Sequence, residues 1–137
     1  MRFLDRAQPF ALTVLRVVLG AVLIAHGQPK VFGGLHQHMA YVGKLGMPAW
    51  FGYLSAGTEF VGGILLIVGL LTRLVGVAVF IEMLVAIFKV HLKHGLAGSG
   101  GYDFPLSITA ISFLFIFYGA GPISLDWLFN PSGESRR

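Results

Sequence analysis

Four long apolar segments divide the chain, with short polar or glycine-rich stretches between them. They cover about residues 9–26, 48–71, 74–93 and 104–119. A helix needs about 20 predominantly apolar residues to cross a bilayer, and the shorter segments reach that length if their polar ends are helical too. The pattern predicts an all-α integral membrane protein, a four-helix bundle that forms a single membrane domain over residues 1–137.

The boundaries of these segments carry local signals for helix ends. Gly27 is a candidate C-cap of the first helix, and Pro29 is expected to prevent simple continuation. A short helix is expected at about 36–45, and Thr72-Arg73 leaves room only for a tight turn. Ser124 is expected to cap a short helix near the end of the chain.

The composition supports a membrane protein and removes several functional classes. Hydrophobic residues make up 55% of the 137 positions and charged residues only 12%, whereas soluble domains carry about 25% charged residues. The chain has no cysteine, which excludes disulfides, thiolate metal sites and a covalent persulfide. The net charge of +4 comes with no basic run, so we predict no nucleic-acid partner.

An even number of spans places both termini on the same side of the membrane. That side would carry five cations and the opposite side four: Arg2, Arg6, Arg73, Arg136 and Arg137 against Lys30, Lys44, Lys89 and Lys93. The positive-inside rule then slightly favours cytoplasmic termini. The tail at 130–137 is polar and is expected to lie outside the bundle.

A carboxylate within the second apolar segment is the feature that most needs explaining. Glu59 lies near the middle of the run and is followed by Gly62 and Gly63. A charge at membrane depth is costly, so it is expected to face the protein interior or a wet cavity and to have a partner. The paired glycines would let a neighbouring helix approach closely.

Two further charges fall inside predicted spans. Counting along the helices from the cytoplasmic side places Arg16 and Glu82 at matching depth, and Glu59 nearer the level of His26 and Lys30. One interpretation is a structural ion-pair network, with Glu82 the preferred partner of Arg16. The other is a functional site around Glu59. A single arginine cannot neutralise two carboxylates, so one of them is expected to be protonated.

All five histidines fall on the outer half of the predicted bundle. Two pairs have spacings found among metal ligands, His36 with His38 and His91 with His94. Residues at i and i+2 of a helix do not share a face, and both spacings are common by chance. We therefore predict no metal site and keep these four histidines as weak candidates. An intramembrane bis-histidine haem is not expected.

The chain also resembles a known family in the order and spacing of its motifs. These are Arg16, His26-Gly27-x-x-Lys30, Phe32-Gly33, Leu45-Gly46-Met47-Pro48, Glu59-x-x-Gly62-Gly63, Gly69-Leu70-Leu71-Thr72-Arg73, Met83-x-x-Ala86, Gly101-Tyr102-Asp103-x-Pro105-Leu106 and Gly119-x-Gly121-x-x-Ser124-Leu125-Asp126. Together they resemble the DoxX family of small bacterial and archaeal membrane proteins. Asp103 stands where the family pattern leads us to expect Glu, and Glu82 falls outside the motifs.

The resemblance implies a four-helix bundle in the cytoplasmic membrane and a link to redox chemistry. The family's namesakes are associated with a thiosulfate:quinone oxidoreductase, and other members with redox-linked membrane complexes. The first hypothesis is therefore a quinone-reactive subunit, with Glu59 as proton acceptor and His26 as hydrogen-bond partner of the head group. Arg16 would tune the site, and Lys30, Glu82 and Asp103 are further candidate ligand-binding residues.

The second hypothesis is a non-enzymatic module, such as a scaffold, a small-solute carrier or a metal-handling partner. The first requires a soluble or peripheral redox partner, because the chain has no evident electron carrier of its own, and either allows a homo-oligomer. For the first hypothesis we predict an outward-opening pocket lined by His26, Lys30, Glu59 and Asp103. The alternative is that these groups satisfy one another in a closed bundle.

Overall fold

The computed structural model describes residues 1–131, and these are almost entirely helical. The elements are α1 (Arg2–Val31), α2 (Leu35–Lys44), α3 (Phe51–Val68), α4 (Thr72–Ala86), a π-helical turn (Ile87–His91), a 3-10 turn (Leu92–His94), α5 (Asp103–Tyr118) and α6 (Leu125–Phe129). Most of the predicted tail at 130–137 lies outside the described residues.

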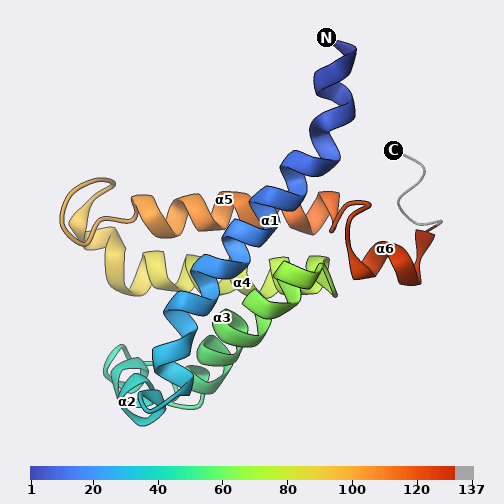
Figure 1. The fold of residues 1–137 in the computed structure, drawn as a ribbon. Coiled ribbons are helices and arrows are strands. Elements are labelled where there is room, and N and C mark those ends of the chain that lie inside the picture. Colours follow the sequence, from blue (N-terminus) through green and yellow to red (C-terminus); the bar gives the residue numbers. More distant parts are fainter. Residues whose placement is uncertain (132–137) are drawn as a thin grey trace.

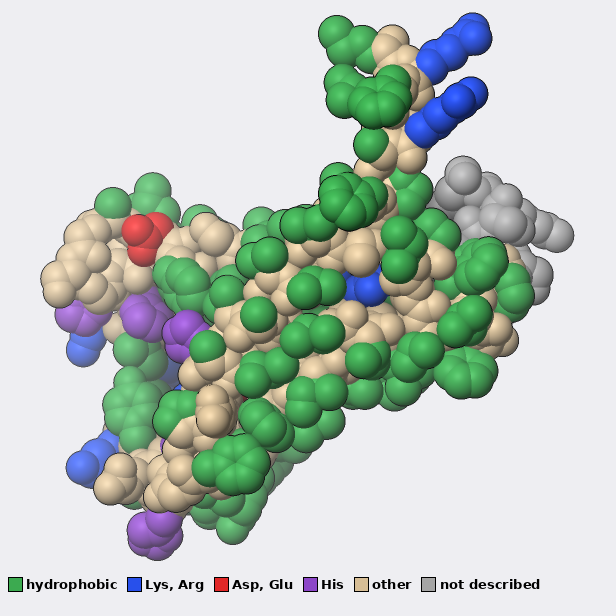
Figure 2. All heavy atoms as spheres, viewed as in Figure 1, with side chains coloured by type: hydrophobic (Ala, Val, Ile, Leu, Met, Phe, Trp, Pro, Cys, Tyr) green, Lys and Arg blue, Asp and Glu red, His purple; other side chains and the backbone are tan. Residues whose placement is uncertain are grey.

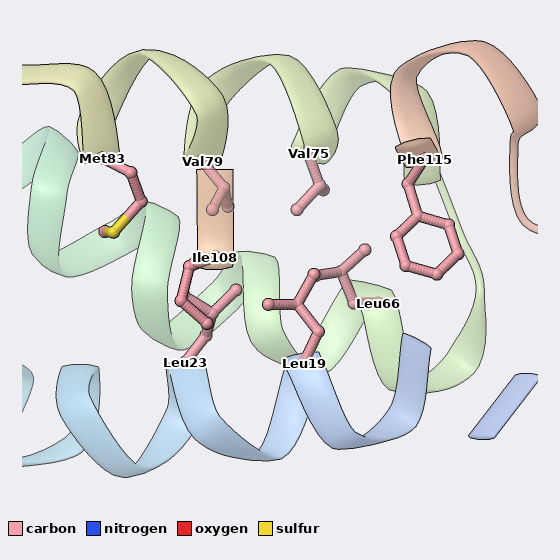
Figure 3. Close-up of a cluster of buried hydrophobic side chains, with 8 residues drawn as sticks. All are labelled: Leu19, Leu23, Leu66, Val75, Val79, Met83, Ile108 and Phe115. Carbon is pink, nitrogen blue, oxygen red and sulfur yellow. The ribbon is translucent and has the colours of Figure 1, made fainter. Parts of the chain in front are cut away.

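The four long helices form two antiparallel pairs (Figure 1). α1 packs along α3, and α4 packs along α5, while α3 and α4 join the two pairs. Side chains from all four helices meet in one hydrophobic core (Figure 3): Leu19 and Leu23 of α1, Leu66 of α3, Val75, Val79 and Met83 of α4, and Ile108 and Phe115 of α5. The predicted four-helix bundle is confirmed.

The outer surface of the bundle is apolar, as expected for contact with lipid. Exposed hydrophobic side chains occur on every long helix, including Val18, Ile64, Ile81 and Phe113. By length and composition, α1, α3 and the continuous helical stretch Thr72–His94 can each cross a membrane, and α5 is a shorter apolar helix. The chain is a multi-pass membrane protein whose surroundings are the lipid bilayer.

Glycines bring α1 and α3 into close contact. A Cβ atom added at Gly63 would lie 2.7 Å from the backbone oxygen of Gly20, and one at Gly20 would lie 2.6 Å from the oxygen of Gly63. The close approach predicted for the paired glycines is confirmed for Gly63. Gly62 faces the other way, where an added Cβ would lie 3.1 Å from Val75 of α4. Neighbouring helices thus fill the space beside both glycines.

The first helix is much longer than the predicted 9–26. α1 runs from Arg2 to Val31 and contains Pro9 and Pro29 in its interior. Gly27 is not a C-cap; an added Cβ there would lie 2.6 Å from the backbone nitrogen of Phe60, so packing on α3 holds this part of α1 helical.

The ends of the other helices differ less from their predicted positions. α3 covers Phe51–Val68 within the predicted 48–71, because Gly69 adopts a left-handed C-cap with φ 70°. α4 begins at Thr72, two residues before the predicted 74–93, so Thr72 and Arg73 are helical and the tight turn expected there lies at Gly69–Leu71 instead. α-Helical geometry gives way to a π turn after Ala86. α5 and the short α2 match their predicted ranges closely.

Candidate functional site

A cluster of polar side chains joins four helices near the end of the bundle where α2 lies. This polar cluster comprises Lys30 of α1, His38 of α2, Ser55 and Glu59 of α3, and Glu82 of α4. Its first element is an ion pair, with 2.6 Å between Nζ of Lys30 and Oε2 of Glu59. Glu59 is 5% exposed, so the charge predicted to need a partner has one in the last turn of α1.

The second element is a chain of two hydrogen bonds. The Ser55 hydroxyl donates to Oε1 of Glu82 over 2.7 Å, and Nε2 of His38 lies 3.1 Å from the same hydroxyl oxygen. Since Ser55 has a single hydroxyl proton and gives it to Glu82, His38 must donate its Nε2 proton to Ser55. An imidazole, a hydroxyl and a carboxyl group are thus linked in series.

Local sequence places these groups on one face. Ser55 and Glu59 are four residues apart on α3, so their side chains share a side of the helix. Gly52, one turn earlier, lets α2 come close; an added Cβ there would lie 3.0 Å from the Cα of Met39. This approach sets His38, the neighbour of Met39, above the polar face of α3.

Charge in the cluster is unevenly compensated. Glu59 has Lys30, but the described residues place no cation within ion-pair distance of Glu82. Oε2 of Glu82 is buried and has no hydrogen-bond partner among the described residues. Burial and the nearby charge of Lys30 lower the pKa of His38, and Glu59 partly opposes them. The cluster therefore contains an ion pair, a neutral histidine and an acceptor that the described residues leave unused.

His26 and Asp103 make their contacts outside the polar cluster. Nδ1 of exposed His26 is 2.9 Å from the Val22 carbonyl, and its ring stacks on Phe104 at a centroid distance of 5.4 Å. Asp103 is exposed and accepts the N–H of Phe104 over 2.8 Å. The structure thus joins Lys30 to Glu59 directly, and it brings His26 to the start of α5, where Asp103 lies.

The end of the molecule around this cluster carries the histidines. Figure 2 shows histidine side chains gathered near the α4–α5 connection and at the α2 end, with a notch in the surface between them. Two other hollows lie elsewhere: one of about 350 Å³ beside Leu71, Thr72 and Asp126, and an apolar groove along α5 near Phe113.

The four candidate metal ligands are dispersed. His38 turns to Ser55, while His36 on the same helix is exposed. Nδ1 of His91 lies 2.8 Å from the carbonyl of Gly100, and His94 is exposed. Across residues 1–131 no group of three or more histidine, aspartate or glutamate side chains is arranged to hold a metal ion.

The predicted pairing of Arg16 with Glu82 is wrong. Arg16 is 2% exposed, and its guanidinium group donates to the carbonyl oxygens of Ala120 and Ile123, the latter over 2.8 Å. Gly69, at the end of α3, lies against the guanidinium carbon. The depth estimate assumed that α1 enters the membrane near Pro9, but its N-terminal turns project beyond the bundle (Figure 1). Arg16 therefore lies at the opposite end from the polar cluster.

A second charged residue completes the structure around Arg16. The Asp126 carboxylate accepts the N–H groups of Leu71 and Thr72 at 2.7 and 2.9 Å, and the N–H of Asp126 donates to Gly69. Ser124 caps α6 by accepting the N–H of Trp127 over 3.2 Å, as predicted. We call Arg16, Asp126 and the Gly69–Leu71 turn the backbone latch, because these hydrogen bonds join the two charged side chains to main-chain groups.

Comparison with known sequences identifies the fold family. The family model for DoxX matches residues 11–92, more than half of the chain. The chain belongs to the DoxX family. A Bacillus subtilis (strain 168) protein named "Putative oxidoreductase CatD" is 36% identical over 98 residues, which are 72% of each chain. An "Uncharacterized protein" of Haemophilus influenzae (strain ATCC 51907 / DSM 11121 / KW20 / Rd) is 35% identical over 135 residues, 92% of this chain and 96% of the relative. No solved structure matches.

The DoxX motifs of the chain divide between the two polar regions. Arg16, the Gly69–Arg73 segment and Asp126 form or adjoin the backbone latch. Lys30 and Glu59 supply the ion pair of the polar cluster. Sequence reasoning missed Ser55, whose only signal is its position four residues before Glu59, and it considered His38 only as a metal ligand. The motifs therefore cover both a structural joint and half of a candidate site.

Proposed function

We propose that this DoxX protein is a quinone-linked redox subunit of a bacterial or archaeal cytoplasmic membrane, with both termini in the cytoplasm. The observation that carries the proposal is the unused buried oxygen of Glu82, one helix away from the Lys30–Glu59 ion pair. A quinol hydroxyl group is a donor that fits such an acceptor, and the surrounding helices offer apolar surface for its ring.

The proposed chemistry requires groups that exchange protons. Oxidation of a quinol to a quinone releases two protons and two electrons. Glu82 accepts a proton at Oε2 in this proposal, since no described cation holds it as a carboxylate. Glu59 was the acceptor expected from the sequence. In the structure Glu59 is paired with Lys30, so we assign it the role of holding Lys30 beside the site.

The aromatic and charged residues near the start of α5 complete the proposed site. The stacked rings of His26 and Phe104 provide a flat surface, and His26 can hydrogen-bond a carbonyl or hydroxyl of the head group through Nε2. We assign Asp103 to the mouth of this site, because it is exposed and hydrogen-bonded to the N–H of Phe104. Arg16 has no part in this site, because it belongs to the backbone latch at the other end.

The two electrons pass to a peripheral electron-transfer protein in this proposal. Support for a redox role comes from the family and from the name of the Bacillus subtilis relative, "Putative oxidoreductase CatD". A homo-oligomer would be compatible with the exposed apolar faces of the bundle.

The test is to identify what the protein retains and whether Glu82 is needed to hold it. The full chain is purified in mild detergent and its bound lipophilic molecules are identified by mass spectrometry, followed by a redox difference spectrum. Quinone at near-equal stoichiometry that is lost in Glu82→Gln, but kept in Lys89→Gln, supports the proposal. Lys89 is an exposed residue of the same helical stretch and serves as the control. Folded protein without quinone, even after quinone is added, contradicts the proposal.

A second candidate function is a non-enzymatic membrane module, as a scaffold, small-solute carrier or metal-handling partner. The observation in its favour is that Lys30 and Glu59 already neutralise each other, which is how a purely structural pair behaves. Stoichiometric copper or zinc on the purified protein, with no redox-active ligand, would favour this function over the first.

A further inference from the structure

We propose that His38 and Ser55 form a proton relay that connects Glu82 to water at the α2 end of the bundle. The inference deepens the proposed function, because it assigns a route for protons released at Glu82, but its test needs no quinone. It rests on three side chains from three helices, joined by hydrogen bonds of 3.1 and 2.7 Å.

Each member of the relay can both give and take a proton. A carboxyl group, a hydroxyl and an imidazole with two ring nitrogens provide the donor and acceptor positions that a proton chain requires. Glu82 is one end of this series of hydrogen bonds, and its Oε2 atom is buried. His38 is half-buried on α2, a short helix with exposed neighbours, including His36 and Gln37. The chain therefore runs from a buried acceptor to the solvated edge of the protein.

The transfer balances without any other reactant. Glu82 takes up a proton at Oε2, and rotation of the carboxyl group presents that proton to Ser55. Exchange with water first converts His38 to its Nδ1–H tautomer, which leaves Nε2 free to accept a proton. As Oγ of Ser55 receives the proton of Glu82, the hydroxyl proton moves to Nε2 of His38. The imidazolium then releases its Nδ1 proton to water, which restores the Nε2–H form that donates to Ser55. Glu82 returns to the carboxylate, Ser55 keeps one proton, and His38 returns to the neutral form.

The charges that face the relay suit this role. Lys30 of α1 lowers the pKa of His38 and Glu59 of α3 raises it. Glu82 of α4 is connected to His38 through the hydroxyl of Ser55. Burial adds to the effect of Lys30 and disfavours a standing charge on the ring. A neutral imidazole that holds a proton only briefly passes it on more readily than one that stays charged.

The test follows the protonation of Glu82 directly. Quinone-free protein in detergent is taken by rapid mixing from about pH 9 to about pH 5, and the carbonyl stretch of protonated carboxyl groups is recorded by time-resolved infrared spectroscopy. The band that is missing in Glu82→Gln belongs to Glu82. The relay predicts that Ser55→Ala and His38→Gln slow the appearance of this band by at least about tenfold, without changing its final amplitude.

The matched control is His36→Gln, a histidine on the same helix that is exposed and outside the chain of hydrogen bonds. It is expected to leave the rate unchanged. Equal rates in wild type, Ser55→Ala and His38→Gln would overturn the relay, as would the absence of any Glu82 band at low pH. Equal rates overturn the relay alone and leave the quinone test standing, whereas a missing Glu82 band counts against both proposals. A failure to retain quinone leaves the relay standing, so the failures of the two proposals can be told apart.

Discussion

The two ends of the bundle hold their charged groups in different ways. At one end, Arg16 and Asp126 bind main-chain carbonyl and N–H groups of the loops around them. At the other end, Lys30, His38, Ser55, Glu59 and Glu82 bind one another through side chains. Main-chain carbonyl and N–H groups do not titrate in this pH range, whereas the side-chain partners of the polar cluster can exchange protons.

This difference indicates where stability and function are separated. In the backbone latch, the charges fix the α3–α4 turn and the α5–α6 connection, so their loss should affect folding. In the polar cluster, most bonds join groups that titrate or lie near the surface, so their loss should affect chemistry more than folding. The following predictions test this division, from the largest expected effect to the smallest.

Replacing Arg16 should have the largest effect. Arg16→Met leaves the carbonyl groups of Ala120 and Ile123 without their donor, and should lower the free energy of unfolding by about 4 kcal/mol. Arg73 also donates to two carbonyl groups, those of Ile116 and Phe117, but it is exposed. Arg73→Met is the control and should cost about 1 kcal/mol or less, because water can replace it. Unfolding by SDS titration measures both.

A double-mutant cycle separates the two ends. Arg16 belongs to the backbone latch and Glu82 to the polar cluster. The loss of unfolding free energy in the double variant Arg16→Met/Glu82→Gln should therefore equal the sum of the losses in the two single variants within about 0.5 kcal/mol. A clear recovery in the double variant would restore the ion pair that the sequence suggested and contradict the division of the molecule into two ends.

Glycine substitutions should damage one end at a time. An added Cβ at Gly69 meets the Cβ of Ser124 at 2.5 Å and the guanidinium carbon of Arg16 at 2.8 Å, at a φ of 70°. Gly69→Ala should therefore cost about 3 kcal/mol. Gly27→Ala presses on Phe60 and Glu59 and should cost about 2 kcal/mol. Histidine titration by NMR should change for His38 in Gly27→Ala only; a change in Gly69→Ala would show that the ends are coupled.

Removing Lys30 alone should cost more than removing the ion pair. Lys30→Met leaves Glu59, at 5% exposure, without its cation and should lower the free energy of unfolding by about 2 kcal/mol. Adding Glu59→Met should return stability to within about 1 kcal/mol of wild type, since apolar pairs often replace buried ion pairs. SDS unfolding of wild type and the two variants measures these differences; a double variant less stable than Lys30→Met would refute the prediction.

The smallest effect should be a pH dependence from His38. Its pKa is lowered in the folded protein, so the unfolded chain binds a proton first as the pH falls below the ordinary value of 6.5. Stability should therefore decline from about pH 7 downward until the lower folded pKa is passed. His38→Gln should flatten this part of the pH profile of the melting temperature, and His36→Gln should not. A profile that His38→Gln leaves unchanged would place the sensitivity elsewhere.

Much of the fold could be predicted because membrane spans leave strong local signals. Apolar length located the four long helices, and glycine spacing indicated the close approach at Gly63. The length of α1 could not be read this way, since a helix that leaves the membrane loses its hydropathy signal. Pro29 also suggested a stop, and packing on α3 overrode it.

The candidate site was only partly visible in the sequence. A carboxylate inside an apolar run requires a partner, and Lys30 followed from its position at the end of the first helix. The partners of Arg16 are carbonyl groups more than 100 residues away, and a backbone group carries no residue type that a sequence pattern could reveal. Ser55 is one small hydroxyl in an apolar segment, and only its spacing from Glu59 connects it to the site.

The unequal lengths of the helices have a consequence for the lipid around the protein. The 30 residues of α1 rise about 45 Å and the 16 residues of α5 about 24 Å, whereas a typical hydrocarbon core is about 30 Å thick. A membrane that matches α5 must thin on that side, and α1 must tilt or extend past it into the headgroups (Figure 1). The bundle therefore requires a thinner bilayer beside α5 than beside α1. Bilayers of lipids with short acyl chains should accommodate the protein with the least bilayer distortion.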